Sequence, residues 1–251
     1  FNTFTCCVGT GMENHSKYGE SIYFEGDDGS LYVNLFIPSQ LNWKSKGVIV
    51  TQSTSFPESG QSSLAFQVKT KKQFTLHIRQ PRWATQGVKV KVNDKIVNVE
   101  KDEYGFLKIK RVWKNSDRVE ISLPQSLYAE AMPDNADRIA FLYGPLVLAG
   151  QLGTAMPDPV YGAPVLLTDN RNITDWIKPA DVPLRFKLNG VGKPHDVELA
   201  PFYKTYDQYY SVYWDYFTTD GWIARSAAYE AEKIKQKELD ERTIDVMRLG
   251  E

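Results

Sequence analysis

Apolar and polar residues alternate along most of the first half of the chain, and this period of two predicts β-strands. The clearest run is residues 74–80, FTLHIRQ, in which every second side chain is apolar. Asn93 and Asp94 lie between two such runs, where they are typical of a hairpin turn. Strands are expected at residues 31–37, 47–53, 64–70, 74–80, 88–92, 95–100, 106–112 and 118–123. So many short, closely spaced strands predict an antiparallel β-sandwich, with a jelly roll as the near alternative.

The second half of the chain predicts further strands around a long connection. Residues 153–183 are rich in Pro, Gly and Asp, so they are expected to be irregular. The run 209–217, YYSVYWDYF, carries too many large apolar residues for a solvated strand, and we expect it to be buried or to line a groove. Strands are expected at residues 126–131, 138–143, 184–188, 195–200 and 209–217. Gly144 and Pro145 break the backbone after the second of these, and residues 146–150 continue the apolar run.

Two helices are predicted, one near each end of the chain. Residues 11–24 begin with Thr10 and Glu13 at the spacing of a capping box, and Glu13 also lies four residues before Lys17, an order that favours an ion pair. Gly19 inside this helix predicts close packing against a neighbour. Residues 226–246 are strongly helical and highly charged, which predicts a helix that lies on a surface or leads to another domain.

Composition excludes several classes of protein. The 251 residues include 30 Lys and Arg and 31 Asp and Glu, so the net charge of −1 gives no general attraction to nucleic acid or to anionic lipid. We therefore expect neither nucleic acid nor a membrane as a partner. The longest apolar stretch, residues 139–150, is shorter than the roughly 20 residues that a membrane-spanning helix needs.

Adjacent cysteines, Cys6 and Cys7, are the strongest candidates for chemistry. Neighbouring cysteines are too close for a relaxed disulfide. A thiolate near a helix N-terminus is stabilised by free N–H groups and by the helix dipole, which makes it a better nucleophile or metal ligand. Two thiolates could bind a soft cation such as zinc, but a tetrahedral site needs further ligands. The alternative is that both are small buried residues that pack the start of the helix.

Other candidates are less distinctive. His77 alternates within a strand and is expected to be a hydrogen-bonded strand residue, and His195 is expected on the surface. His15 could face the same pocket as the cysteines or pack locally. A polar and aromatic group near residue 210 could stack on sugars, although a role in the core with a polar rim is favoured. Its members are Asp207, Tyr209, Tyr213, Trp214 and Asp215.

Three segments together resemble one family of enzymes. Residues 6–24 read CCVGTGMENHSKYGESIYF, residues 138–150 read RIAFLYGPLVLAG, and residues 209–217 are followed by a charged helix. These motifs resemble the β-L-arabinofuranosidase family of glycoside hydrolases, formerly a family of unknown function. The Cys-Cys motif is the specific part of this resemblance.

The resemblance implies an (α/α)6-barrel catalytic domain followed by two β-sandwich domains. The chain is then mainly β, with the end of the barrel at residues 1–24, antiparallel β-sandwich domains at 25–126 and 127–225, and a charged helix or linker at 226–251. It also implies a retaining reaction at β-L-arabinofuranosyl linkages of plant-type glycans. Cys6 would be the nucleophile that forms a glycosyl-thioether, Cys6 and Cys7 would be zinc ligands, and a separate glutamic acid would protonate the leaving oxygen.

The family's remaining zinc ligands, its acid and its sugar-binding histidines lie upstream of this motif and outside the chain. We therefore expect the chain alone to be inactive, to hold zinc weakly or not at all, and to need an N-terminal catalytic barrel as its partner. The resemblance implies a periplasmic or secreted protein, although the chain shows no signal peptide. The alternative is a non-catalytic β-sandwich module that binds carbohydrate or braces a neighbouring domain. A redox or metal sensor built on Cys6 and Cys7 is a weaker third possibility.

Overall fold

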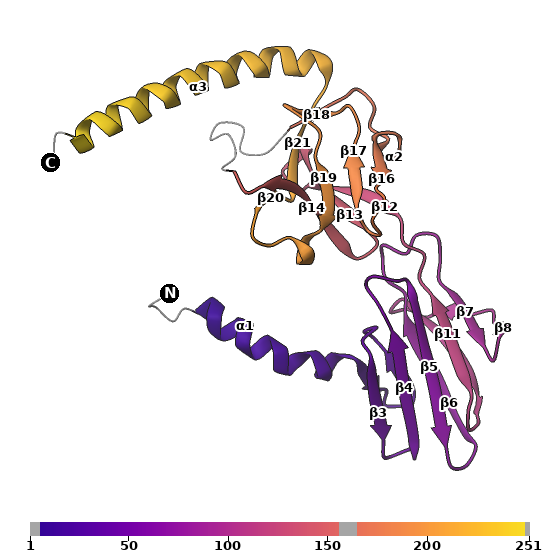
Figure 1. Ribbon diagram of the computed structural model, residues 1–251. Helices are drawn as coiled ribbons and strands as arrows, with labels where there is room; N and C mark the ends of the chain where they lie inside the picture. Colours follow the sequence, from indigo (N-terminus) through magenta and orange to yellow (C-terminus); the bar gives the residue numbers. More distant parts are fainter. Residues whose placement is uncertain (1–5, 156–164, 249–251) are drawn as a thin grey trace. The chain divides into compact units, whose positions relative to one another are not determined.

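The computed structural model describes residues 6–155 and 165–248, with side chains described as far as residue 243. The chain divides into two compact units, Phe1–Gln125 and Ser126–Glu251. Figure 1 shows the strands of each unit and the two long helices, α1 and α3. The predicted mainly β fold, with a helix near each end, is confirmed.

Unit 1 is a sandwich of two sheets in its described residues, and almost all of its strand pairs are antiparallel (Figure 1). One parallel pair, β2 with β6, joins strands that are distant in sequence. The first sheet has the order β1 (Tyr23–Glu25), β2 (Leu31–Val33), β6 (Lys72–Arg79), β10 (Phe106–Trp113) and β9 (Glu100–Lys101). The second has the order β3 (Ser39–Trp43), β4 (Val48–Thr54), β5 (Gln61–Val68), β11 (Arg118–Ser122), β7 (Lys89–Val92) and β8 (Lys95–Ile96).

Aromatic rings from both sheets meet in the core of unit 1. The ring of Trp113 stacks on Phe66, with centroids 4.4 Å apart, and on Phe74, with centroids 5.5 Å apart. The indole Nε1 of Trp113 donates a hydrogen bond of 3.1 Å to the carbonyl oxygen of Phe74, so its one polar atom is satisfied. Alternation places these side chains inward, as the sequence predicts. Burial of each large ring contributes about 1.5–3 kcal/mol to folding.

The hairpin predicted at Asn93 and Asp94 is confirmed. Both residues have positive φ angles, 49° and 65°, and the flanking strands β7 and β8 pair with Val92 opposite Lys95. Asn93 also accepts a hydrogen bond from the backbone N–H of Arg118 at 2.9 Å and donates one to Asp117 at 2.8 Å. The side chain therefore ties the turn to β11.

Unit 2 contains a ten-stranded sheet in the residues that the structure describes. Its inward side chains form one core. Figure 1 shows the course of most of these strands. Phe141, Trp176 and Trp214 are buried at the centre of the core. The main path runs β16 (Ile177–Pro179), β17 (Phe186–Leu188), β19 (Glu198–Pro201), β14 (Leu146–Gly153), β13 (Asn135–Tyr143), β21 (Tyr213–Phe217), β15 (Val165–Leu167) and β18 (Gly192–Lys193). β12 (Leu127–Met132) pairs with β13, and β20 (Tyr209–Ser211) pairs with β14.

Several predicted elements are wrong in extent. The strand predicted at residues 31–37 ends at Val33, and the described part of the connection 153–183 contains β15, the short helix α2 (Ile173–Trp176) and β16. Residues 156–164 of that connection lie outside the described residues. β15 was missed because its partners, β18 and β21, are far away in sequence. β16 pairs with the nearby β17 but has just three residues, too few to show alternation.

Both long helices differ from their predicted bounds. α1 spans Cys6–Lys17, η1 follows at Tyr18–Ser21, and Phe24 belongs to β1. The capping box at Thr10 and Glu13 is therefore wrong, because both residues lie inside the helix, where the backbone N–H groups already have helical partners. α3 spans Thr219–Arg248, which is longer than the predicted 226–246.

Candidate active site

Cys6 and Cys7 occupy the first turn of α1 and are both exposed, free thiols. The backbone N–H groups of a first helical turn have no partner within the helix, and the positive end of the helix dipole lies there. The sequence predicts a helix that begins after both cysteines. The structure instead places both cysteines inside the first turn of that helix. Burial of the pair as small packing residues is wrong in this chain, because neither side chain is covered.

None of the described residues of α1 is buried. Val8 is 46% exposed and Met12 is 68% exposed, and the two lie four residues apart on one face of the helix. The close packing expected at Gly19 is also wrong, because no described atom lies within 4 Å of the position that a Cβ would take. The helix thus carries apolar side chains that nothing described covers.

The polar residues of α1 contact one another. Nζ of Lys17 lies 4.0 Å from the carboxylate of Glu13, as predicted, and 3.5 Å from that of Glu20. The ring of His15 packs edge-on against Tyr18 with centroids 5.9 Å apart. His15 therefore packs locally, one of the two roles that its position left open.

The donor set near the helix terminus is suited to zinc but incomplete. Two thiolates are soft ligands of the kind that zinc binds, and Cys6 and Cys7 could supply them. Within the described ranges, no group of three or more His, Cys, Asp or Glu residues could hold a metal ion. The two cysteines would therefore contribute only part of a coordination shell.

His77 is buried and fully engaged in unit 1. Its Nδ1 lies 2.7 Å from Oδ2 of Asp102, and its ring stacks on Tyr32 with centroids 4.1 Å apart. Burial tends to raise the pKa of Asp102, but the hydrogen bonds from the Phe106 N–H, from His77 and from the Tyr104 N–H outweigh it and hold this pKa below its usual value. This is the hydrogen-bonded strand residue that the sequence predicts, and His195 is exposed as predicted.

The polar and aromatic group near residue 210 separates into core and surface. Trp214 is 1% exposed and belongs to the core, whereas Tyr209 and Tyr213 are 43% and 52% exposed. Asp215 forms a two-pronged ion pair with Arg138, at 2.7 and 3.0 Å. The predicted core role therefore holds for Trp214. The exposure of Tyr213 was missed because the run of apolar residues hid the alternation within β21, and Tyr209 lies on the separate strand β20.

The hollows described in unit 1 lie on its second sheet. One, of about 690 Å³, is lined by Asn93 and Arg118, and the other, of about 730 Å³, by Lys44 and Ile49. Both are open to solvent and share Gln67 and Asn115. Neither of these two hollows includes a cysteine. In addition, no described helix is both long and apolar enough to span a membrane.

Comparisons with known proteins agree with this architecture. Residues 30–125 match the family model "Beta-L-arabinofuranosidase, GH127 middle domain". A GH127 β-L-arabinofuranosidase from Geobacillus stearothermophilus is 20% identical with a TM-score of 0.63, and the match covers 84% of this chain and 37% of that one. A structure described as a glycoside hydrolase is 18% identical with a TM-score of 0.64, covering 85% and 40%. A GH127 β-arabinofuranosidase is 22% identical with a TM-score of 0.61, covering 84% and 38%.

The chain thus spans about two fifths of the length of these solved structures. The search of curated proteins found no match. The structural matches show that the fold is shared across most of the chain, and the family model identifies the first sandwich. The resemblance to the β-L-arabinofuranosidase family is thereby confirmed, with residues 30–125 matching its GH127 middle domain.

Proposed function

We propose that this chain is the C-terminal part of a retaining glycoside hydrolase that acts on β-L-arabinofuranosyl linkages, with Cys6 as its nucleophile. The observation that carries the proposal is the GH127 middle-domain match at residues 30–125. It begins shortly after α1, the helix that presents two free thiols and ends at Lys17. The catalytic remainder would belong to a longer protein, in keeping with the two fifths of each solved structure that the chain covers.

The position of Cys6 suits covalent catalysis. The first turn of α1 presents Cys6 beside backbone N–H groups that have no partner within the helix, at the positive end of the helix dipole. The sulfur of Cys6 would attack the anomeric carbon, forming a C–S bond while the glycosidic C–O bond breaks. The leaving oxygen would take a proton from an acid outside this chain. Water, losing a proton to that same group now acting as a base, would then attack the anomeric carbon from the face opposite the sulfur and break the C–S bond. The two inversions regenerate Cys6 and retain the configuration.

Cys6 and Cys7 are proposed as zinc ligands, and the exposure of both thiols leaves them accessible. Zinc bound there would keep the thiolates deprotonated. Since the described residues add no third ligand to the pair, the rest of the shell would come from the missing part of the protein. We accordingly propose that this chain alone is inactive and binds zinc weakly.

We place the longer protein in the periplasm or outside the cell. The proposed substrates, arabinofuranose-containing plant glycans, are polymers that occur outside the cell. Two cysteines that a bound metal protects from oxidation are compatible with such a compartment. Immunoblotting of cell fractions against the sandwich units tests this placement, and recovery of all the protein in the cytosol would contradict it.

The decisive experiment uses the protein encoded by the complete parent gene. Initial rates on a p-nitrophenyl β-L-arabinofuranoside are compared for the wild type, Cys6→Ala, Cys7→Ser and the control Ser16→Ala on the same helix. Loss of the nucleophile should lower kcat by at least about 1,000-fold. Cys7→Ser should lower both the rate and the zinc content, and Ser16→Ala should change neither. If Cys6→Ala keeps wild-type activity, the proposed nucleophile is wrong.

The expected inactivity of the isolated chain has its own comparison. The 251-residue chain and the complete protein are assayed side by side at equal molar concentration. The chain should show no turnover above the buffer rate. Turnover by the chain at a rate comparable to that of the complete protein would contradict the proposal.

A further inference from the structure

The segment 202–210 of unit 2 presents a dense group of aromatic side chains to solvent. Five of its nine residues are aromatic, and we call this segment the aromatic loop. Their exposed fractions are 43% for Phe202, 52% for Tyr203, 73% for Tyr206, 43% for Tyr209 and 46% for Tyr210. Burial of these rings would stabilise the fold. A group of rings that stays exposed therefore marks a binding surface.

The two ends of the aromatic loop meet. The rings of Phe202 and Tyr210 lie 5.2 Å apart between centroids, although they are eight positions apart in sequence. Tyr210 is part of β20 and pairs with Gln151 of β14, while Phe202 begins the short helix η2 (Phe202–Lys204). The loop therefore folds back on itself, so its aromatic residues are gathered in one region.

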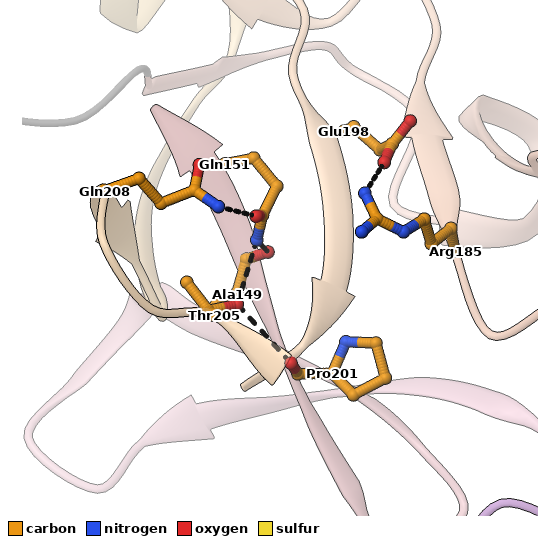
Figure 2. A network of polar contacts seen from close by, with 7 residues as sticks. All are labelled: Ala149, Gln151, Arg185, Glu198, Pro201, Thr205 and Gln208. Atoms are coloured by element: carbon orange, nitrogen blue, oxygen red, sulfur yellow. Dashed lines mark hydrogen bonds and ion pairs between the residues drawn. The ribbon is translucent and has the colours of Figure 1, made fainter. Parts of the chain in front are cut away.

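Gln151 anchors the aromatic loop to the sheet, as Figure 2 shows. Its Nε2 donates to Oγ1 of Thr205 at 2.9 Å and to the carbonyl oxygen of Ala149 at 3.1 Å. Its Oε1 accepts a hydrogen bond of 2.5 Å from Nε2 of Gln208. Thr205 is buried and its hydroxyl also reaches the carbonyl oxygen of Pro201. The polar side chains thus point inward and fix the backbone, while the rings face outward.

This arrangement lowers the cost of binding. Tyrosine rings have few rotatable bonds, so little side-chain entropy is lost when they contact a ligand. The hydrogen bonds of Gln151 and Thr205 hold the backbone of the loop, so less backbone entropy is lost when a ligand binds. A preorganised surface of this kind is suited to a rigid ligand with a flat apolar face.

The composition of the aromatic loop indicates the chemistry of that ligand. The two charged residues of the loop are Lys204 and Asp207, whose opposite charges cancel. This disfavours a nucleic acid as the ligand, because a nucleic acid needs a basic groove beside the stacking rings. The loop contains no Leu, Ile, Val or Met, which disfavours an aliphatic partner surface. A ring carrying C–H groups on one face and hydroxyls at its edge matches tyrosines, whose faces are apolar and whose hydroxyls form hydrogen bonds.

We propose that the aromatic loop is a binding site for neutral glycans, in which the rings of Phe202, Tyr206 and Tyr210 stack on sugar faces. Binding here requires no bond cleavage, and the three rings lie in unit 2, whereas Cys6 lies in unit 1. It therefore stands or fails separately from the proposed chemistry of Cys6.

Affinity electrophoresis of the full 251-residue chain tests the proposal. Native gels contain arabinan, arabinogalactan or xylan, and the mobility of the chain is compared with that in a gel without polysaccharide. At least one polysaccharide should retard the wild type. The double variant Tyr206→Ala/Tyr210→Ala should weaken binding by about tenfold or more because two stacking rings are lost. Tyr104→Ala, which removes a tyrosine 75% exposed in the other unit, should bind like the wild type.

Further variants guard against loss of folding. Tyr206→Phe keeps the ring and should retain most of the binding, and far-ultraviolet circular dichroism should show that each variant is folded. If no polysaccharide retards the wild type, or if the double variant is retarded equally, the proposal is overturned. It is also overturned if the wild type elutes as a dimer that the double variant converts to a monomer without any glycan retardation, since the aromatic loop would then contact a second copy.

Discussion

Asp102 and His77 form one hydrogen-bonded unit, with 2.7 Å between Oδ2 of Asp102 and Nδ1 of His77. The other carboxylate oxygen of Asp102 accepts the backbone N–H groups of Tyr104 at 3.0 Å and Phe106 at 2.8 Å. One carboxylate therefore fixes both the buried imidazole of β6 and the turn that leads into β10.

Acidification should remove this contribution. The folded pKa of Asp102 lies below its ordinary value, so the stabilisation is present above the unfolded pKa of about 3.9 and is lost as pH falls through the folded pKa. Asp102→Asn should lower the free energy of unfolding at pH 7 by about 1–3 kcal/mol and flatten its decline below about pH 4. Urea titrations across this pH range measure both effects. The exposed neighbour variant Glu103→Gln serves as control, and equal behaviour of the two variants would contradict the assignment.

Gly150 should tolerate no side chain. A Cβ at this position would fall inside van der Waals contact of the Trp214 ring and within 3.3 Å of Val197. Gly150→Ala should therefore destabilise unit 2 by about 1–3 kcal/mol through overpacking. Thermal unfolding provides the measurement, with Gly11→Ala as a control, since no described atom lies within 4 Å of a Cβ there. A melting temperature unchanged by Gly150→Ala would show that the ring moves without cost.

Both thiols should react in the folded chain. Cys6 and Cys7 are exposed and free, so a thiol reagent such as 5,5′-dithiobis(2-nitrobenzoate) should titrate both without denaturant. Cys6→Ser and Cys7→Ser should each leave one reactive thiol. Protection of either thiol until urea is added would contradict the exposed first turn of α1.

Removal of metal should leave the isolated chain unchanged. Because the described residues offer no third ligand near the two cysteines, the folding of either unit should not depend on zinc. The melting temperature with and without excess EDTA should agree, and 4-(2-pyridylazo)resorcinol should withdraw any added zinc rapidly. One equivalent of zinc that resists this chelator would show that the chain holds a complete site.

The hairpin at Asn93 and Asp94 offers a stabilising change. Asp94 has a φ of 65°, which glycine adopts without the steric cost that other residues pay. Asp94→Gly should raise the free energy of unfolding by up to about 1 kcal/mol, since Asn-Gly is the favoured pair for this turn. The comparison variant is Asn93→Ala, which should lower the free energy of unfolding because it loses the hydrogen bonds to Arg118 and Asp117. A lower melting temperature for Asp94→Gly would contradict this interpretation.

The sequence predicts those strands in which alternation is strong and misses those that depend on distant pairing. β5 and β10 follow from their apolar positions alone, whereas β3, SQLNW, has just two apolar side chains, and β15 exists through partners on β18 and β21. Helix starts were equally hard to place, because Thr10 and Glu13 have the spacing of a cap while lying inside α1. For the candidate site, the rare Cys-Cys pair could be singled out from sequence. Its ligands and its acid could not be placed, because the described residues bring none to it.

The uncovered apolar surface of α1 has a consequence for the stability of the turn that holds Cys6. A helix of 12 residues that buries no side chain is marginal in water, since the cost of nucleating its first turn is barely recovered. The free backbone N–H groups of its first turn stay beside Cys6 only while that turn is wound. A surface that covers Val8 and Met12 would bury apolar area and would thereby hold this turn, and with it the position of Cys6, in place.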